Sequence, residues 1–182
     1  NDPDCVTKFG STRFGNVLGS RGSVVPLFKR QIESGGPLTL TDRAMTRFIM
    51  SLEEAARLVL DSVWLAGNGE VLVTKMPVAR IEDIAQAMIT GLSAERAIKI
   101  EEIGAKPGEK MYEELMNDEE VRRTREYGNF FIITPAFADK DGTEYNYLRD
   151  CAIPDRSYDS SVEKSMDLEE VTKYLSSSGL IR

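Results

Sequence analysis

The amino-acid sequence predicts an α/β fold. The first reason is that segments with strand periodicity alternate with segments with helix periodicity along the chain, which is typical of layered α/β proteins. The second is the composition, since 41% hydrophobic and 29% charged residues are typical of a globular chain. The third is the length of 182 residues, which suits one ordinary domain or one domain with an arm.

The first predicted element is a short strand that passes through a glycine-containing turn into a helix, within residues 11–32. The turn is expected at residues 19–22, and the helix near Ser23 as N-cap, with Pro26 in its first turn. Such a junction leaves backbone N–H groups unpaired at the start of the helix. With Arg21 beside them, these groups form a competent anion or phosphate site; an ordinary turn between strand and helix is the alternative.

The remaining elements follow from caps, turn residues and hydrophobic period. Two capping boxes predict helix starts, at Ser51 with Glu54 and at Asp167 with Glu170. Helices are predicted at residues 52–64, 81–91, 111–125 and 168–175, and strands at 38–41, 45–50, 70–74, 98–101 and 129–133. The apolar stripe of the helix at 52–64 is predicted from helical spacing and comprises Leu52, Ala55, Ala56, Val59 and Val63.

The composition changes near residue 138, after which Asp, Lys, Gly, Ser and Tyr dominate until Met166. We therefore expect a body of residues 1–137 and a C-terminal arm of residues 138–182 with a short terminal helix. The first residue is not Met, which suggests a fragment or an engineered chain. No apolar run approaches the ~18 residues of a membrane span, and the first residues lack the pattern of a signal peptide.

Composition also excludes several function classes. The net charge of −7 argues against nucleic acid or an anionic membrane surface as the main partner. The chain has no histidine, which removes Ser-His-Asp and Cys-His nucleophiles and every His-ligated metal. Its two cysteines, Cys5 and Cys151, fit no metal spacing, so we predict no metal site and a reducing, cytoplasmic compartment.

Three blocks of the sequence carry a resemblance to a known family. The blocks RFGNVLGSRGSVVPLFKRQI, MTRFIMSLEEAARLVL and KPGEKMYEEL occur in the order and spacing of the inverting UDP-N-acetylglucosamine 4,6-dehydratases of the extended short-chain dehydrogenase/reductase superfamily. The resemblance covers roughly residues 8–136. It implies that the α/β fold is the C-terminal, substrate-binding part of an extended short-chain dehydrogenase, without its N-terminal Rossmann half.

Two motifs of that superfamily do not occur in the sequence. There is no G-x-G-x-x-G, the dinucleotide fingerprint, and no Tyr-x-x-x-Lys, the pair that deprotonates a sugar hydroxyl during hydride transfer in the family. In the family both lie upstream of the RFGNV block. We therefore expect no catalytic residue in this chain. NAD or NADP is expected in the parent enzyme, and none bound to this chain alone.

Arg47 is the strongest candidate for ligand binding. It lies in an alternating strand beside apolar residues, and a buried guanidinium needs an acid or an anionic ligand. The alternatives from the residues alone are an edge arginine that reaches solvent or one that pairs with Asp42. The resemblance implies that Arg47 contacts the diphosphate of a UDP-sugar.

The resemblance assigns further substrate contacts. Asn16 corresponds to an asparagine that holds the sugar-nucleotide phosphates, although a turn asparagine bonded to its own backbone is the alternative. Lys106 stands where the family usually has an arginine that assists the diphosphate, and it keeps the charge but loses bidentate geometry. Glu109 corresponds to the acid that reaches the ribose hydroxyls. Arg21 would complete the diphosphate site.

Four more residues are assigned by position only. Lys75 and Met76 correspond to residues that flank the uracil. Arg13 and Phe14 align with residues close to the nicotinamide end of the cofactor, although a surface arginine and a core phenylalanine are equally ordinary.

The sequence as a whole predicts the UDP-sugar recognition part of a nucleotide-sugar 4,6-dehydratase that acts on UDP-N-acetylglucosamine in polysaccharide or surface-glycan biosynthesis. One alternative is a UDP-sugar epimerase of the same superfamily. Another is a non-catalytic module that binds a nucleotide-sugar or a partner protein. We also expect a homo-oligomer, because exposed apolar residues, among them Phe14, Val17, Phe130 and Phe131, would favour self-association.

Overall fold

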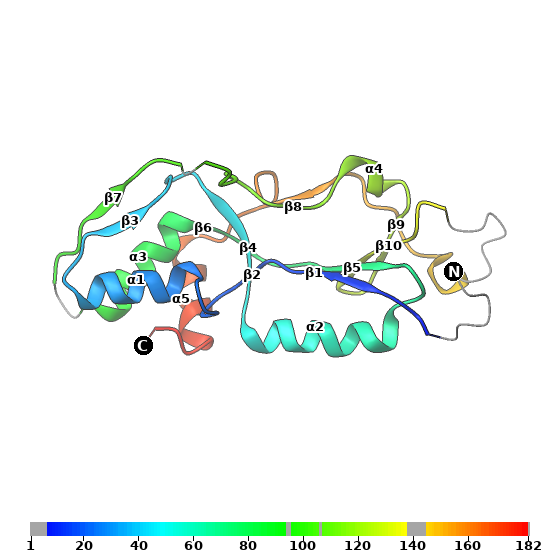
Figure 1. Ribbon diagram of the computed structural model, residues 1–182, viewed down its shortest axis with the longest axis horizontal. Coiled ribbons are helices and arrows are strands. Elements are labelled where there is room, and N and C mark those ends of the chain that lie inside the picture. Colours follow the sequence, from blue (N-terminus) through cyan, green and yellow to red (C-terminus); the bar gives the residue numbers. More distant parts are fainter. Residues whose placement is uncertain (1–6, 94–95, 106, 138–144, 182) are drawn as a thin grey trace. The chain divides into compact units, whose positions relative to one another are not determined.

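The computed structural model has the predicted α/β class, with parallel and antiparallel strands and packed helices (Figure 1). The residues that it describes are 7–93, 96–105, 107–137 and 145–181. They group by contact into two compact units. The first unit comprises residues 1–14, 54–75 and 114–158, and the second comprises residues 15–53, 76–113 and 159–182.

The first unit is built around a four-stranded sheet with the order β1-β5-β10-β9. The strands are β1 (Ser11–Arg13), β5 (Val71–Thr74), β10 (Phe130–Ile133) and β9 (Thr124–Tyr127). β1 pairs with β5 in parallel, whereas β10 is antiparallel to both of its neighbours. Leu72 and Ile132 are directly opposite each other and fully buried, and with Leu148 they form the core of this unit.

Helix α2 (Leu52–Leu65) contributes most of its length to the first unit. Its buried residues are Ala55, Leu58 and Ser62. The stripe predicted from the sequence is therefore wrong at most of its positions, because Val59 is 45% exposed and Val63 is 74% exposed. Helical spacing gives the period of the apolar residues, but the neighbouring sheet decides which of several apolar stripes is buried.

The helix predicted at residues 111–125 is also wrong. This segment holds strand β8 (Glu114–Met116), the four-residue helix α4 (Asp118–Val121) and the start of β9. Asn117 interrupts a continuous helix because it is the N-cap of α4, accepting from the Glu120 backbone N–H while the Glu120 side chain accepts from the Asn117 N–H. β8 pairs with the two-residue strand β11 (Tyr158–Asp159).

The second unit contains two small sheets. β2 (Asn16–Val17), β4 (Thr46–Met50) and β6 (Val78–Arg80) have the order β2-β4-β6, with β2 parallel and β6 antiparallel to β4. β3 (Leu38–Leu40) and β7 (Ile100–Glu102) form a separate parallel pair. The predicted strands at 38–41, 45–50 and 98–101 are confirmed within one or two residues.

Three helices cover these strands and complete the core of the second unit. They are α1 (Val24–Glu33), α3 (Ile81–Leu92) and α5 (Leu168–Ser177), and α3 packs against both α1 and α5 (Figure 1). Phe28, Ile84 and Leu175, one from each helix, are at most 1% exposed. The capping box predicted at Asp167 is confirmed, and Gly179 follows α5 with φ +68°.

The single strand predicted at the start of the chain is instead two strands, β1 and β2, which belong to different sheets. Gly15 lies just before β2. A Cβ built on Gly15 would lie 2.8 Å from the Phe48 carbonyl oxygen and 3.0 Å from the Met76 sulfur. A side chain at this position would collide with the backbone of β4, so glycine is required for the close approach.

The sequence predicts one C-terminal arm after residue 137. In the structure this part of the chain is divided, because residues 145–158 group with the first unit and 159–182 with the second. The assignment of residues 1–137 as a substrate-binding domain stays a prediction. Within the described residues, no helix has the length and apolar character needed to cross a membrane.

Candidate functional site

The candidate site is a pocket of about 250 Å³ in the second unit. Its lining comes from β2, the start of α1, β3, β4, the first residue of α3, and the segments after β7. Three of the residues predicted from the sequence to bind substrate are brought together here, namely Asn16, Arg47 and Glu109. Most of the other lining residues are apolar, as is usual for small-molecule sites.

Strand pairing explains why Asn16 and Arg47 lie together. Asn16 of β2 is paired in parallel with Ile49 of β4, and Arg47 is two residues before Ile49. Side chains alternate along a strand, so Arg47 and Ile49 share a face, and residues directly opposite in register share it too. The short β2 therefore places an amide and a guanidinium side by side at one wall of the pocket.

Arg47 is buried, with only 8% of the residue exposed. Its guanidinium has three contacts within the protein. Nη1 donates to the Thr46 carbonyl at 2.7 Å, and Nη2 donates to the Lys110 carbonyl at 2.5 Å. Nε lies 3.7 Å from the Glu113 carboxylate. The alternative of a pair with Asp42 is not observed, because the Asp42 carboxylate instead accepts from the Ala44 backbone N–H at 2.7 Å.

Glu113 is a partly buried acid with incomplete hydrogen bonding. Burial raises the pKa of its carboxyl, and the nearby Arg47 guanidinium, the Phe48 backbone N–H and Lys110 oppose that rise. Its Oε2 atom is buried and has no hydrogen-bond partner among the described residues. An uncompensated carboxylate oxygen is costly, so Glu113 is poised to gain a proton or a donor.

The segment that carries Glu109 continues to Glu113, where hydrogen bonds to Ser160 hold it in place. Ser160, which is fully buried, donates its N–H to the Glu113 carbonyl at 2.9 Å, and its Oγ accepts from the Glu113 N–H at 2.9 Å. The Thr46 N–H donates to the Met111 carbonyl at 3.1 Å. Glu109 itself is exposed and accepts from the Thr41 hydroxyl at 3.0 Å, and both of these residues line the pocket.

The start of helix α1 forms another wall of the pocket. Ser23 is the N-cap, as predicted, but its hydroxyl makes no capping bond, and its Oγ is buried without a hydrogen-bond partner among the described residues. Gly22 precedes it with φ +80°, and no acidic residue lies in the first turn of the helix. Arg21 is exposed beside Gly22. These features suit a negatively charged ligand at this end of the pocket.

The other predicted residues are placed as follows. Met76 is buried and packs against the Gly15 backbone. Lys106 lies outside the described residues. Lys75, in the first unit, forms an ion pair with Glu126 and has its Nζ 4.8 Å from the Phe131 ring centroid. Their binding roles stay predictions.

The two residues assigned to the cofactor also belong to the first unit. Arg13 forms a bidentate pair with Glu120 at 2.6 and 2.7 Å and donates to the Leu115 carbonyl at 2.7 Å. Phe14 is 41% exposed. The cofactor roles of both residues stay predictions.

Sequence reasoning missed Glu113, which lies in the segment predicted to be a helix at residues 111–125. One signal was present: Met111, Glu113 and Leu115 alternate, and both Met111 and Leu115 are at least partly buried. A period of two indicates an extended segment, in which Glu113 points the same way as its apolar neighbours. Thr41 and Ser23 were also missed as lining residues, since only the folded β3 and α1 bring them to the pocket.

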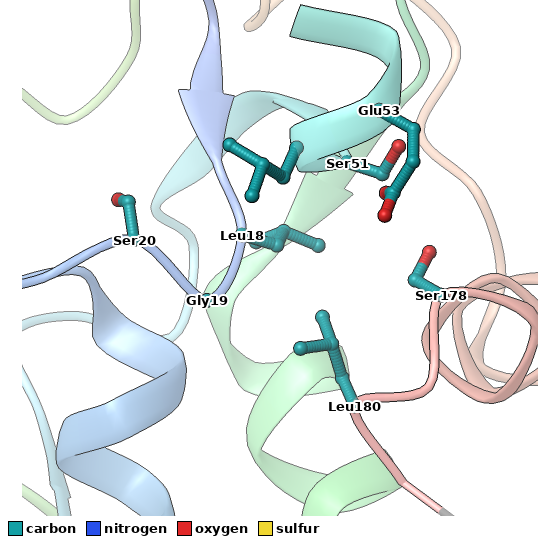
Figure 2. Close-up of a pocket in the computed structure, with 8 residues that line it drawn as sticks. Leu18, Gly19, Ser20, Ser51, Glu53, Ser178 and Leu180 are labelled. Atoms are coloured by element: carbon teal, nitrogen blue, oxygen red, sulfur yellow. The ribbon is translucent and has the colours of Figure 1, made fainter. Parts of the chain in front are cut away.

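A second pocket of about 220 Å³ in the same unit has a different character (Figure 2). It is lined by residues from the segment after β2, the start of α2 and the segment after α5, and Figure 2 shows Glu53 and Ser178 on one side of it and Ser20 on the other. Its only charged lining residue is an acid. The pocket with Arg47 is therefore the better candidate for an anionic ligand.

Comparisons with known proteins identify relatives of this chain. A family model described as "Polysaccharide biosynthesis protein" matches residues 1–135. The chain is 43% identical over 138 residues to the UDP-N-acetylglucosamine 4,6-dehydratase (inverting) of Campylobacter jejuni, covering 74% of this chain and 40% of that protein. It is 37% identical over 175 residues to the UDP-glucose 4-epimerase of Rickettsia bellii, covering 93% of this chain and 49% of that protein.

The fold is similar to a solved structure. The X-ray structure of Pen from Bacillus thuringiensis matches with a TM-score of 0.82 and 38% sequence identity, over 93% of this chain and 49% of that chain. The chain spans about half the length, or less, of the curated relatives it matches.

Proposed function

Because this chain belongs to the family of polysaccharide biosynthesis proteins, we propose that it is the UDP-sugar recognition part of a nucleotide-sugar 4,6-dehydratase that acts on UDP-N-acetylglucosamine. The observation that carries the proposal is the pocket that gathers Asn16, Arg47 and Glu109 beside the start of α1. The similarity to the Campylobacter jejuni dehydratase supports the reaction and the sugar.

The chemistry of the pocket matches the parts of a nucleotide-sugar. Arg47 and Asn16 offer charged and amide donors for a diphosphate, and an arginine recognises phosphate oxygens through charge-assisted hydrogen bonds. Glu109 offers acceptor oxygens for ribose hydroxyls. Leu27 and Ile103, which line the pocket and are 40% and 55% exposed, offer apolar surface for the base.

The size of the pocket fits part of such a ligand. A volume of about 250 Å³ is slightly below the ~300–1,000 Å³ typical of small-molecule sites. We therefore assign this pocket to the nucleotide and diphosphate, with the sugar extending beyond it toward the catalytic groups of the parent enzyme.

The parent reaction would oxidise C4 of the sugar, eliminate water across C5 and C6, and return the hydride. The cofactor, NAD or NADP, would supply the hydride acceptor in the parent. In the first unit Arg13 is already paired with Glu120, and the sequence has no G-x-G-x-x-G. The role of this chain would then be to bind and orient the diphosphate and the nucleoside.

A UDP-sugar epimerase is the second candidate, because the Rickettsia epimerases match 90–93% of this chain. Both functions share the same nucleotide site. They differ in the product that a parent enzyme would form from UDP-N-acetylglucosamine, a 4-keto-6-deoxy sugar or the 4-epimer, so product analysis of a parent that carries this segment separates them.

Calorimetric titration of the chain tests the shared proposal. We expect UDP and UDP-N-acetylglucosamine to bind, UMP to bind more weakly, and free N-acetylglucosamine to show no binding, because Arg47 and the start of α1 recognise the diphosphate. If UDP fails to bind at millimolar concentration while the chain remains folded, the nucleotide-sugar function is wrong. If the free sugar binds as well as UDP, the assignment of this pocket to the nucleotide is wrong.

A further inference from the structure

Glu113 is the only carboxylate within 4.0 Å of the Arg47 guanidinium among the described residues. The other two contacts of Arg47 are backbone carbonyls, which orient the guanidinium without neutralising it. A guanidinium has five N–H groups, and the two hydrogen bonds to carbonyls use two of them. Arg47 therefore keeps donors for a ligand, and Glu113 is the group that decides how much of its positive charge a ligand meets.

The contact between Arg47 and Glu113 is close, but it leaves hydrogen-bonding capacity of the carboxylate unused. The Arg47 Nε to Glu113 Oε1 distance of 3.7 Å is longer than the 2.7–2.9 Å of a charge-assisted hydrogen bond. The second oxygen, Oε2, is buried and has no hydrogen-bond partner among the described residues. A fully formed pair would use both oxygens, as Glu120 does with Arg13.

The surroundings of Glu113 hold few charges. The groups that face it are the Arg47 guanidinium from β4 and the Lys110 side chain from its own segment, with the neutral Phe48 N–H from β4. On the side of the C-terminal segment, the hydrogen bonds between Ser160 and Glu113 involve the Glu113 backbone and not its carboxylate. A diphosphate that reaches Arg47 therefore adds negative charge next to a carboxylate whose cationic neighbours, among the described residues, are Arg47 and Lys110.

We propose that Glu113 is a positioning residue for Arg47, and that binding of a diphosphate in the pocket is coupled to uptake of a proton by Glu113. The proposal rests on the nucleotide-sugar function proposed above. The ionised carboxylate competes with the diphosphate for the guanidinium and repels it. The protonated carboxyl still supports Nε through its carbonyl oxygen but leaves the full positive charge of Arg47 to the ligand.

The sign of the effect follows from linkage. An anion bound near Glu113 favours the neutral carboxyl, so the complex binds more protons than the free protein, and affinity falls as pH rises through the pKa of Glu113. Burial, which raises that pKa, brings the transition closer to neutral pH. UDP-N-acetylglucosamine is the appropriate probe, because both of its phosphates are diesters and do not titrate in this range.

The experiment measures the affinity for UDP-N-acetylglucosamine as a function of pH for the wild-type chain, Glu113→Gln, Glu113→Ala and the matched control Glu114→Gln. Glu114 is exposed and next in sequence, so its variant makes the same change of charge without the contact to Arg47. We expect wild type and Glu114→Gln to bind about threefold to tenfold more weakly at high pH than at low pH. Glu113→Gln should bind independently of pH, at the tighter value, and Glu113→Ala should bind more weakly than Glu113→Gln because nothing holds Nε.

Proton uptake by the wild-type chain is a second measurement that needs no variant. Calorimetric titrations in two buffers with different ionisation enthalpies should give different apparent enthalpies, which report protons taken up on binding. A Glu113→Gln variant that keeps the wild-type pH profile, or a wild-type chain that binds without proton uptake, would overturn the proposal. If wild type does not bind at all, or Arg47→Ala binds as tightly, it is instead the nucleotide-sugar function that fails.

Discussion

Two arginine–glutamate pairs of this molecule use the same residue types for different purposes. In the first unit, Arg13 and Glu120 form a bidentate pair at 2.6 and 2.7 Å, and Glu120 also accepts from the Asn117 backbone N–H at 3.1 Å. In the second unit, Arg47 and Glu113 are 3.7 Å apart, and one Glu113 oxygen has no hydrogen-bond partner among the described residues. The pKa of Glu120 is lowered, mainly by the hydrogen bond from Arg13, whereas the pKa of Glu113 is raised, mainly by burial.

The difference shows how to separate a structural ion pair from one that serves a ligand. A pair whose donors and acceptors are all satisfied by protein groups contributes to folding and has nothing left to bind. A pair that borders a pocket and keeps unsatisfied groups has capacity for a ligand, at a cost in stability. Burial alone does not distinguish them, since Glu120 is 5% exposed and Arg47 is 8% exposed.

The largest expected effect is on the stability that the saturated pair provides. Glu120→Ala removes both oxygens from Arg13 and also the capping box of α4, so we expect a loss of about 2–4 kcal/mol in the free energy of unfolding. The matched control is Glu119→Ala, which removes an exposed acid from the same helix and should cost much less stability. Urea denaturation measures the free energy of unfolding of both variants. Equal losses would show that the ion pair between Arg13 and Glu120 contributes no more to stability than an exposed acid.

The next effect is on ligand binding by the unsaturated pair. Arg47→Ala should weaken UDP binding about tenfold to a hundredfold, because charge-assisted hydrogen bonds contribute about 1.5–3 kcal/mol. Arg47→Lys should recover only part of the affinity, since an ammonium lacks the planar fork. Arg13→Ala is the control, and it should lower the melting temperature with UDP affinity unchanged. A loss of stability in Arg47→Ala without loss of affinity would remove Arg47 from the site.

A smaller effect is the opposite pH dependence of the two acids. The lowered pKa of Glu120 means that its contribution to stability is present above the unfolded pKa of about 4.3 and is lost as pH falls through the folded value. The raised pKa of Glu113 means that the folded state favours its protonated form, so its contribution is lost as pH rises through the folded value. Denaturation of Glu120→Gln and Glu113→Gln across this range should therefore show differences from wild type that change in opposite directions, and parallel changes would contradict the assignment.

The smallest effect concerns the second acid of the pocket. Glu109 is exposed and accepts from the Thr41 hydroxyl at 3.0 Å. Thr41→Val removes this donor while keeping the shape of the side chain, and we expect about a twofold to threefold loss of UDP affinity. Thr39→Val is a comparison two residues earlier, in β3, where the hydroxyl instead accepts from Gln31 at 2.7 Å. Its main effect should be on the melting temperature.

Much of the fold could be predicted from local signals. The caps at Asp167 and Ser23, the strands at residues 45–50 and 129–133, and the helix at 81–91 all follow from residues within a few positions of each other. The helix predicted at 111–125 failed because one capping asparagine in its middle outweighs the helical period. The apolar stripe of α2 failed because its buried side depends on a partner that is distant in sequence, and the self-association inferred from exposed apolar residues stays a prediction.

The candidate site was predictable to the extent that a resemblance supplied it. Asn16, Arg47 and Glu109 were named from three sequence blocks, and the structure brings them to one pocket. The partners that decide what these residues do were not predictable. Glu120 is 107 residues from Arg13, and Glu113 is 66 residues from Arg47 on a segment expected to be helical. Pairs of this separation are set by the packing of elements and leave no local pattern.

The two hydrogen bonds between Glu113 and Ser160 have a consequence for substitutions outside the pocket. Every residue proposed to touch the ligand precedes residue 110, yet the segment that carries Glu109 is held through two hydrogen bonds between Glu113 and Ser160. A substitution that removes the Ser160 hydroxyl would leave all of these residues in place and still loosen the wall of the pocket that carries Glu109. Loss-of-function substitutions are therefore expected at Ser160, where a comparison of binding motifs alone would see no reason for them.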